Sequence, residues 1–281
     1  MKKVKHYLDV LRQQHFPIRF ILSRLLMRSG LCRFVTIHTD TYRMKFHPST
    51  LAAMKWVERD ERDEERLAKR YLRRGDTVVD VGANVGSFAL TAAKTIAPGV
   101  VYAYEAHPRI YKYLVENIEL NGFANVHAIN RAAGSTKGNV GFTDKWSDVL
   151  NRVSRDGEIS VPLTPLDEDF KSISGNVALM KIDVEGYEIE VLKGAIGLLS
   201  RCDCILLEAC SSHQKFFDYG TTDLVALLRP LGFSVFGCDY ALNEIYCFDD
   251  QEVPERFEDI LFVRNVDDLL RRTGLRLQVG N

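Results

Sequence analysis

The sequence predicts an α/β fold in which helices cover both faces of a mostly parallel sheet. From Gly75 onward, short apolar runs alternate with segments of helical periodicity, which is the pattern of a doubly wound sheet. The composition is that of a globular domain, since 46% of the 281 residues are hydrophobic and 27% are charged. The formal net charge of −1 argues against a nucleic-acid partner, because such binders are usually far more basic.

Seven strands are expected, each a short apolar run, and helices are indicated where apolar residues recur every three or four positions. The expected strands cover residues 77–81, 100–104, 126–129, 177–182, 205–207, 234–236 and 260–263, and the expected helices cover residues 87–97, 109–121, 188–199 and 222–231. Asn121-Gly122 is the stop signal of the second helix. Residues 137–163 are typical of a β-hairpin, which Pro162 and Pro165 keep at a sheet edge.

Residues 1–50 are basic, with ten lysines or arginines against two acids, Asp9 and Asp40. Pro17 separates two short helical patterns. Their apolar positions are Val4, Tyr7, Leu8 and Leu11 before the proline, and Ile18, Ile21, Leu22, Leu25 and Leu26 after it. Two interpretations are open: the apolar stripe packs on its own domain as a lid, or residues 1–50 make peripheral contact with an anionic membrane. The charged run at 58–66 predicts a solvated helix face.

The cysteine pattern favours buried, reduced thiols in a cytoplasmic protein. The six cysteines include no Cys-x-x-Cys pair, and Cys202 and Cys204 are too close for a usual zinc knuckle. No uncharged apolar run is long enough for a transmembrane helix or a signal-peptide core. We therefore expect a cytoplasmic location, with peripheral membrane contact as the alternative for the N-terminal segment.

A loop of small residues follows the first strand and opens directly into a helix. Small residues let a ligand approach the backbone, and the helix N-terminus presents unpaired N–H groups to an anion. The nicotinamide fingerprint Gly-x-Gly-x-x-Gly is absent, because Asn84 and Ser87 occupy two of its glycine positions. An acid at this strand end suits a ligand with a cation beside its carboxylate, such as S-adenosylmethionine. The candidate residues for this cofactor are Asp80, Gly82, Ala83, Asn84 and Gly86.

Residues after the second and third strands predict a nucleoside ligand. Glu105 follows the second strand, where an acid accepts hydrogen bonds from both hydroxyls of a ribose. Asn130, Arg131 and Ala132 follow the third strand, at the depth where an adenine ring would lie. The same logic serves NAD, so these residues alone do not choose the cofactor.

Acids also follow the fourth and fifth strands. Asp183 and Glu185 end the fourth strand, Glu208 ends the fifth, and His213 comes five residues later. Methyl transfer to a hydroxyl needs a base, and Asp183, Glu185 and His213 are the candidates, with Glu208 beside them and Asp183 also near the cofactor. Helix capping is the alternative for the first two. Asp183 and Glu208 suit a divalent cation, but no third ligand is evident, so no metal is predicted.

Four ordered motifs at these strand ends carry a family resemblance. They are GDTVVDVGANVG at 75–86, YEAHP at 104–108, NIELNG at 117–122 and KIDVEGYEIEVLKGA at 181–195. Together they resemble the FkbM-type family of S-adenosylmethionine-dependent methyltransferases. That family usually has Glu-Pro where this chain has Glu105-Ala106, so the acid is kept and Ala106 takes the next cofactor position.

The resemblance implies a class I methyltransferase fold, with a seven-stranded, mostly parallel, Rossmann-like sheet. The resemblance covers about residues 75–210. We expect the whole chain to divide into a basic helical and β extension or lid (1–74), an S-adenosylmethionine-binding domain (75–265) and a C-terminal tail (266–281). The resemblance also implies an activity, the methylation of a hydroxyl on a sugar, glycan or natural-product acceptor. The alternatives are an NAD(P)-dependent oxidoreductase and a non-catalytic cofactor-binding module at a membrane surface. Oligomeric state is not predicted.

Overall fold

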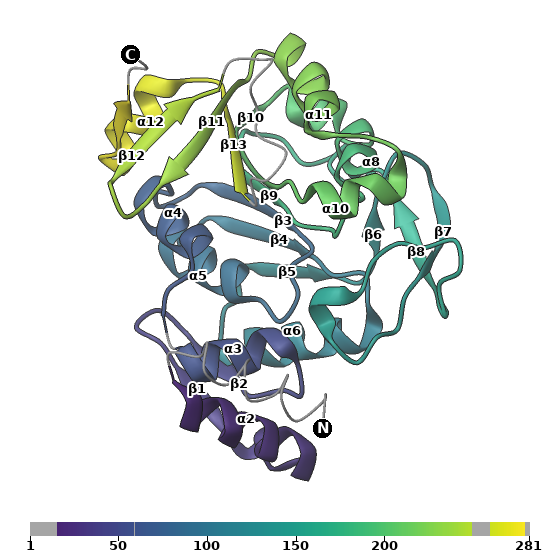
Figure 1. Cartoon of the computed structure of the whole chain (residues 1–281). Coiled ribbons are helices and arrows are strands. Elements are labelled where there is room, and N and C mark those ends of the chain that lie inside the picture. Colours follow the sequence, from purple (N-terminus) through teal and green to yellow (C-terminus); the bar gives the residue numbers. More distant parts are fainter. Residues whose placement is uncertain (1–15, 59, 249–258, 279–281) are drawn as a thin grey trace.

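The computed structural model describes residues 16–58, 60–248 and 259–278, and a nine-stranded sheet forms the centre of this described part (Figure 1). Its strands are β3 (Thr77–Val81), β4 (Val100–Tyr104), β5 (Val126–Ile129), β9 (Val177–Ile182), β10 (Cys202–Glu208), β11 (Ser234–Asp239), β12 (Glu244–Cys247), β13 (Asp259–Val263) and β14 (Arg276–Gln278). All seven expected strands are present. The expected count was nevertheless too low, because β12 and β14 extend the sheet at one edge.

The strand order is β14-β12-β11-β13-β10-β9-β3-β4-β5. The central strands β10, β9, β3, β4 and β5 are parallel, and β13 is inserted antiparallel between β10 and β11. The chain runs outward from β3 through β4 to β5 and then returns to β9 on the other side of β3. The sheet therefore has a switch point between β3 and β9, which is where such sheets bind ligands.

Helices cover both faces of the sheet, as the sequence predicts. One face packs against α4 (Asp63–Tyr71), α5 (Ser87–Ile96), α6 (Pro108–Asn121) and α12 (Val266–Thr273). The other packs against α7 (Leu166–Asp169), α8 (Glu188–Lys193), α9 (Ile196–Leu199) and α11 (Thr221–Leu228). Neighbouring strand residues such as Val78 and Val79 point into opposite layers, which explains why these strands are apolar throughout.

The single helix expected over 188–199 is instead two helices, α8 and α9. A Cβ on Gly194 would lie 2.0 Å from the carbonyl oxygen of Gly134, so the backbone approaches another segment where α8 ends. The segment 266–281, expected to be a tail, contains α12 and β14, and β14 pairs in parallel with β12.

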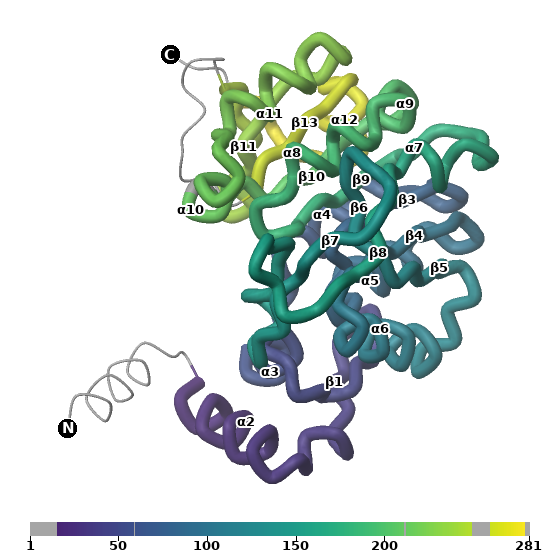
Figure 2. Tube along the Cα trace, turned by 90° about the vertical axis from the view of Figure 1, so that its right-hand side faces the viewer, coloured from purple at the N-terminus to yellow at the C-terminus, as the bar shows by residue number. Residues whose placement is uncertain are grey.

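The predicted hairpin is confirmed. The strands β7 (Gly138–Phe142) and β8 (Ile159–Thr164) pair antiparallel, and β6 (Ala132–Ala133) joins β8 in parallel to complete a separate three-stranded sheet. Figure 1 shows this small sheet to the right of the main one, and Figure 2, which looks from that side, shows it toward the viewer.

The described part of the N-terminal extension comprises α2 (Pro17–Ser29), β1 (Thr36–His38), β2 (Arg43–Lys45) and α3 (Thr50–Glu58). Its core, which includes Met44 and Phe46, packs against Leu90 of α5 and Ile110 of α6. Of the five apolar positions expected to form a stripe after Pro17, Leu26 packs on this core, whereas Ile18, Ile21, Leu22 and Leu25 are exposed. The lid interpretation is therefore wrong for most of that stripe. The four apolar positions before Pro17 lie outside the described residues.

The prediction of a solvated face at 58–66 is wrong for two of its acids. Glu64 and Glu65 are 5% and 3% exposed. Glu64 pairs with Arg62, whose Nε lies 2.9 Å from its Oε1, and Glu65 pairs with Lys55 of α3. Burial is possible because each carboxylate meets a cation.

Two expectations about the whole chain can be compared with the described residues. No helix there has the length and apolar character needed to cross a membrane. All six cysteines are free, and Cys32, Cys202 and Cys204 are buried as expected, but Cys247 is exposed.

Candidate active site

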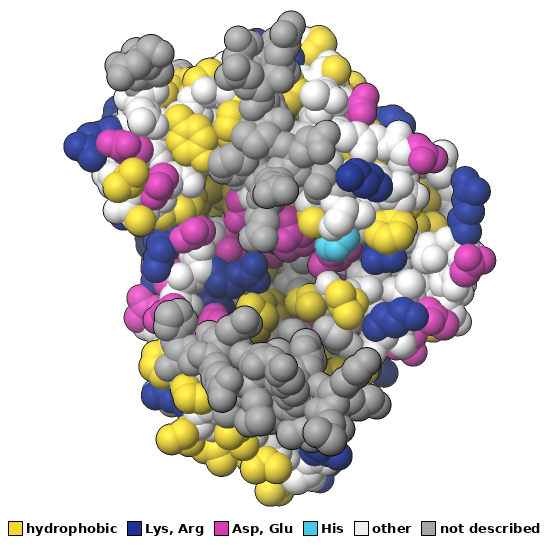
Figure 3. All heavy atoms as spheres, in the orientation of Figure 1, with side chains coloured by type: hydrophobic (Ala, Val, Ile, Leu, Met, Phe, Trp, Pro, Cys, Tyr) yellow, Lys and Arg dark blue, Asp and Glu magenta, His cyan; other side chains and the backbone are white. Residues whose placement is uncertain are grey.

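A cavity of about 280 Å³ opens at the switch point, where β3, β4, β9 and β10 end. Figure 3 shows acidic and basic side chains gathered around a hollow in the middle of this face. Most of the predicted site residues line the cavity. They are Asp80, Gly82, Ala83, Asn84, Glu105, Ala106, Arg131, Ala132, Asp183, Glu185 and Glu208.

The loop after β3 lies directly against the end of β9. Gly82 has a φ of +84°, and a Cβ there would lie 1.8 Å from the carbonyl oxygen of Asp183. Because no side chain fits in that gap, the position requires glycine. Sequence and structure thus agree on why the loop is built from small residues.

Glu105 is held by backbone donors at the edge of the cavity. The N–H of Asn84 donates to its Oε2 (2.9 Å), and the N–H of His107 donates to its Oε1 (2.8 Å). Asn84 itself takes a left-handed conformation, with φ of 51°. Burial raises the pKa of Glu105 to about 7, although both hydrogen bonds oppose the rise. The carboxyl group is therefore fixed in position.

Asp80 is fully buried, and neither carboxylate oxygen has a hydrogen-bond partner among the described residues. Its register neighbour on β9 is Lys181, whose ammonium donates to Oδ2 of Asp183 at 2.8 Å. Burial raises the pKa of Asp80 to about 7, because Lys181 offsets only part of the desolvation. Since an unpartnered buried carboxyl group is costly, this arrangement indicates a site for a ligand that carries positive charge.

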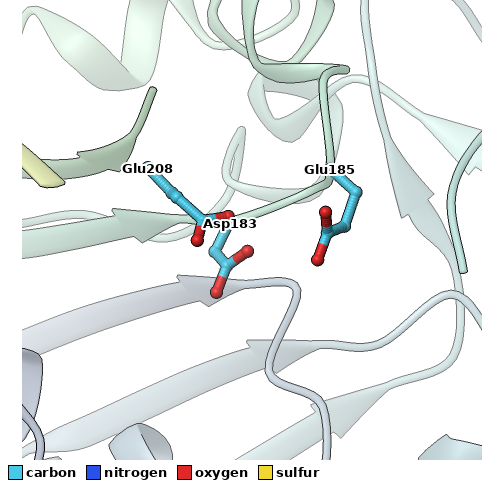
Figure 4. A group of neighbouring side chains, drawn as sticks. All are labelled: Asp183, Glu185 and Glu208. Atoms are coloured by element: carbon cyan, nitrogen blue, oxygen red, sulfur yellow. The ribbon is translucent and has the colours of Figure 1, made fainter. Parts of the chain in front are cut away.

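Asp183, Glu185 and Glu208 converge beside it from the ends of β9 and β10 (Figure 4). One carboxylate oxygen of each lies within 4.8 Å of the others. Burial and the charge of Asp183 raise the pKa of Glu208. Burial also acts to raise the pKa of Asp183, but the charge of Lys181 and a hydrogen bond from Glu208 outweigh it and hold that pKa below its usual value. Asp183 is therefore the ionised member of the pair.

Glu185 forms a second pair with His213, whose Nδ1 lies 2.8 Å from its Oε2. Glu185 has a φ of 57°, a strained conformation for a residue with a side chain, and such strain concentrates at functional sites. Burial, aided by the charge of Asp183, raises the pKa of Glu185 to about 8. Burial lowers the pKa of His213. Near neutral pH the proton therefore stays on Glu185, and His213 is the unprotonated member of the pair.

The three carboxylates also have the composition of a divalent-cation site, since hard cations prefer oxygen ligands. Glu185 is the third carboxylate that such a site would need and that the sequence did not reveal. Its position depends on the left-handed backbone at that residue, which no sequence pattern predicts.

The roof of the cavity comes from α3 and from the connection between β7 and β8, two segments that no sequence motif linked to the site. The helix contributes Leu51 and Met54, and the connection contributes Asp148. Asp148 fastens the two together, because its carboxylate accepts from the N–H groups of Thr50 and Leu51 at the start of α3. This contact joins residues 98 positions apart, which explains why it was missed.

Charged residues at one wall were also missed. Arg62 and Glu64 reach the cavity from the beginning of α4, and Lys181 reaches it from β9. Lys181 is the first residue of the motif at 181–195 and precedes Asp183 by two positions. That position in the motif could have identified it as a site residue. Arg62 and Glu64 lie in the charged run that was expected to face solvent.

Three predicted residues are not among those that line the cavity: Gly86, Asn130 and His213. A Cβ on Gly86 would lie 2.7 Å from Leu114, so this glycine permits helix packing. Asn130 donates to the carbonyl oxygens of Glu105 (2.8 Å) and Ala106 (3.1 Å) and so supports the loop after β4.

Comparison with known proteins places this geometry in a family. The FkbM methyltransferase domain matches residues 80–235, which is more than half of the chain and includes β4, β5, β9 and β10. The chain belongs to the FkbM methyltransferase family. The strand order, with an antiparallel strand next to β10, is that of the class I methyltransferase fold, and the cofactor of the family is S-adenosylmethionine.

Individual relatives cover parts of this FkbM methyltransferase. A hexuronic acid methyltransferase from Haloferax volcanii is 28% identical over 155 residues, which are 53% of this chain and 62% of that protein. A tRNA (guanine(37)-N(1))-methyltransferase from Saccharomyces cerevisiae is 35% identical over 124 residues, which are 43% of this chain and 23% of that enzyme. The chain thus spans less than two thirds of either relative.

Among solved structures, fibrillarin from Aeropyrum pernix in complex with natively bound S-adenosyl-L-methionine aligns with a TM-score of 0.39 and 15% identity. The alignment covers 71% of this chain and 72% of that chain.

The residues of the cavity fit the cofactor of the family. S-adenosylmethionine carries an ammonium and a sulfonium, and the orphaned carboxyl group of Asp80 lies in the cavity to meet positive charge. The fixed carboxyl group of Glu105 is suited to ribose hydroxyls. The close approach at Gly82 and the small side chains of Ala106 and Ala132 leave the cavity open between these acids.

Proposed function

We propose that this FkbM methyltransferase transfers a methyl group to a hydroxyl oxygen of a sugar, glycan or natural-product acceptor. The observation that carries the proposal is the pairing of Glu185 with His213 at the cavity that holds Asp80. Transfer to a hydroxyl requires removal of its proton, and this pair can accept one near neutral pH. When bound, S-adenosylmethionine supplies the electrophilic methyl group.

Different residues bind the cofactor and orient the acceptor. Asp80, the loop through Asn84 and Glu105 bind the cofactor, while Arg131 and Ala132 lie further along the same cavity. Asp183, kept ionised by Lys181, orients the acceptor hydroxyl, and Glu208 holds the proton that keeps Asp183 in place.

Glu185 passes its own proton to the unprotonated Nδ1 of His213, 2.8 Å from its Oε2, and takes the hydroxyl proton in its place. No step in this scheme requires a metal, since Lys181 already neutralises Asp183. The acceptor enters between the strand ends and the roof formed by α3 and the β7–β8 connection.

Two alternatives remain as outcomes of the test. The hexuronic acid methyltransferase among the relatives supports a sugar acceptor, whereas the tRNA methyltransferase supports transfer to a base nitrogen. We favour the sugar, because the formal net charge of −1 provides little general attraction for a polyanion. The match to a methyltransferase family disfavours the nicotinamide oxidoreductase alternative.

The first experiment measures thermal unfolding of the full chain with S-adenosylmethionine, S-adenosylhomocysteine, NAD and NADP. A ligand at about one hundred times its Kd adds ~2.7 kcal/mol to the free energy of unfolding, which is roughly 5–10 °C here. We expect the two adenosyl compounds alone to stabilise the chain. The shift should be lost in Glu105→Ala and kept in Glu168→Ala, whose side chain is exposed at the surface. A shift with NAD instead would overturn the cofactor assignment.

The second experiment follows a labelled methyl group from S-adenosylmethionine into p-nitrophenyl glucuronide, p-nitrophenyl glucoside and bulk tRNA. The proposal is supported if the label appears in a glycoside and is held there as an ether, which alkali does not cleave. Label in tRNA alone would replace it with base methylation. Cofactor binding without transfer to any hydroxyl compound would favour the non-catalytic module.

A further inference from the structure

The outer face of α2 is apolar and uncovered in the described structure. Ile18, Leu22 and Leu25 are 73%, 45% and 58% exposed, and their spacing puts them in one stripe along the helix. Ile21 extends the stripe sideways. The stripe lies opposite Ser23 and Met27, which are buried against the rest of the extension.

The patch continues past the end of α2. Gly30 ends the helix in a left-handed conformation, and a short 3₁₀ turn, Leu31–Phe34, follows. Leu31 and Phe34 of that turn are 53% and 74% exposed. Side chains of this size that are grouped together on a surface mark an interaction site, whereas isolated ones do not. We call these six residues the α2 patch: Ile18, Ile21, Leu22, Leu25, Leu31 and Phe34.

The stretch of sequence that carries the α2 patch contains arginines and no acid. Arg19, Arg24, Arg28 and Arg33 lie within it or at its border, and the sequence has no acid from Val10 to Thr39. Three of the guanidinium groups lie over aromatic rings of the same segment: Arg19 over Phe16 at 5.2 Å, Arg24 over Phe20 at 4.9 Å and Arg33 over Phe34 at 5.0 Å. Among the described residues, none of these four arginines has a carboxylate partner within 4 Å.

We propose that the α2 patch docks this protein onto an anionic lipid surface. An amphipathic helix with exposed leucine and isoleucine beside arginines binds at such an interface, because the apolar side chains enter the headgroup region while the guanidinium groups meet lipid phosphates. The absence of any acid across this stretch favours a surface of uniform negative charge over a protein partner, which would present a particular arrangement of charges.

The position of α2 relates this surface to the cavity. Both ribbon views place α2 at one end of the molecule with α3 next to it (Figures 1 and 2). Arg19 of α2 reaches the carbonyl oxygen of Val57 in α3, and α3 supplies Leu51 and Met54 to the cavity. A single helix layer therefore separates the docking surface from the roof. The proposal stands independently of the proposed function.

The experiment is co-flotation of the full chain with vesicles of phosphatidylcholine alone or with added phosphatidylserine. The wild-type chain should float with the anionic vesicles and not with the neutral ones, and added salt should release it. The variant Leu22→Glu/Leu25→Glu should lose about tenfold or more of the binding. Because both side chains are exposed, its unfolding temperature should stay near that of the wild type.

A matched control is Leu242→Glu/Leu277→Glu, which changes two leucines that are 59% and 40% exposed near the far edge of the main sheet. It carries the same charge change and should bind vesicles as the wild type does. A second variant, Arg24→Gln/Arg28→Gln/Arg33→Gln, keeps the apolar patch and should also lose binding to anionic vesicles.

Three results would overturn the proposal: no flotation of the wild type with anionic vesicles, equal flotation with neutral vesicles, or equal losses in the patch and control variants. A wild-type dimer that becomes monomeric in Leu22→Glu/Leu25→Glu, without vesicle binding, would show instead that the patch joins two copies of the chain.

Discussion

Two groups of buried charges in this protein differ in how completely they are paired. In the N-terminal extension, Oε1 of Glu65 accepts from the hydroxyl of Tyr42 at 2.7 Å, and its Oε2 accepts from Lys55 and from the N–H of Arg62. We call Tyr42, Lys55 and Glu65 the paired cluster. Each oxygen of its carboxylate is engaged, so its charges join β1–β2, α3 and α4 into one unit.

At the strand ends, Asp80 and Asp183 share the ammonium of Lys181, Glu208 donates a hydrogen bond to Asp183, and both oxygens of Asp80 lack a partner among the described residues. We call these four residues the strand-end cluster. Because both clusters are buried, burial alone does not identify a functional charge. What marks the site is a buried acid whose partner is missing, because folding does not compensate its desolvation and a ligand can.

The largest expected effect comes from the strand-end cluster. Asp183→Asn should lower kcat by about 10²–10⁴-fold, because an amide neither attracts Lys181 nor orients a hydroxyl, while the KM for S-adenosylmethionine changes little. Steady-state kinetics separate the two parameters. Asp63→Asn, at an exposed acid of α4, is the control and should keep full activity. Equal losses in turnover and cofactor affinity would make Asp183 structural.

The paired cluster should respond in stability instead of activity. Lys55→Met leaves Glu65 buried without its cation, which costs about 3–5 kcal/mol of the free energy of unfolding and roughly 6–20 °C in Tm. Lys45→Met breaks an exposed pair with Glu116 and should cost no more than about 1 kcal/mol. Differential scanning calorimetry measures both. If both variants lost a similarly small free energy of unfolding, the paired cluster would not be a source of stability, and its contrast with the strand-end cluster would fail.

A smaller effect is expected at Asp80, where substitution should stabilise the folded chain, whereas Lys55→Met should destabilise it. The pKa of Asp80 rises on folding from its ordinary 3.8 to about 7, so the folded chain holds this proton more tightly than the unfolded chain does. Its contribution to stability therefore falls as pH rises through that window. Cofactor-free Asp80→Asn should gain in Tm relative to the wild type as pH rises from about 4 to about 7, and should be stabilised less by S-adenosylhomocysteine. If the Tm of the wild type and that of Asp80→Asn changed with pH in parallel, the carboxyl group of Asp80 would not be buried without a partner.

The smallest expected effect is that of metal removal. Dialysis against EDTA should leave the initial rate unchanged, because Lys181 and the proton on Glu208 already balance Asp183. Loss of activity with EDTA and its recovery with Mg²⁺ would instead make Asp183, Glu185 and Glu208 ligands of a cation.

The floor of the cavity was predictable because each of its residues follows a recognisable strand. Asp80, Glu105 and Asp183 end apolar runs, and parallel strands bring their carboxyl ends to one edge of the sheet. The roof was not predictable, since Asp148 binds the start of α3 across 98 residues without any motif. The charged run at 58–66, which includes the first turn of α4, was misread for the same reason, because the cation that pairs with buried Glu65 belongs to another helix.

The sequence by itself determined the seven expected strands and the acids at their ends, because strand periodicity and small-residue turns are local properties of the chain. Tertiary structure decided which charges are paired, that Glu185 joins Asp183 and Glu208, and that the stripe of α2 faces outward. Those outcomes depend on the distance between residues far apart in the chain. Local patterns do not contain that distance, and only packing sets it.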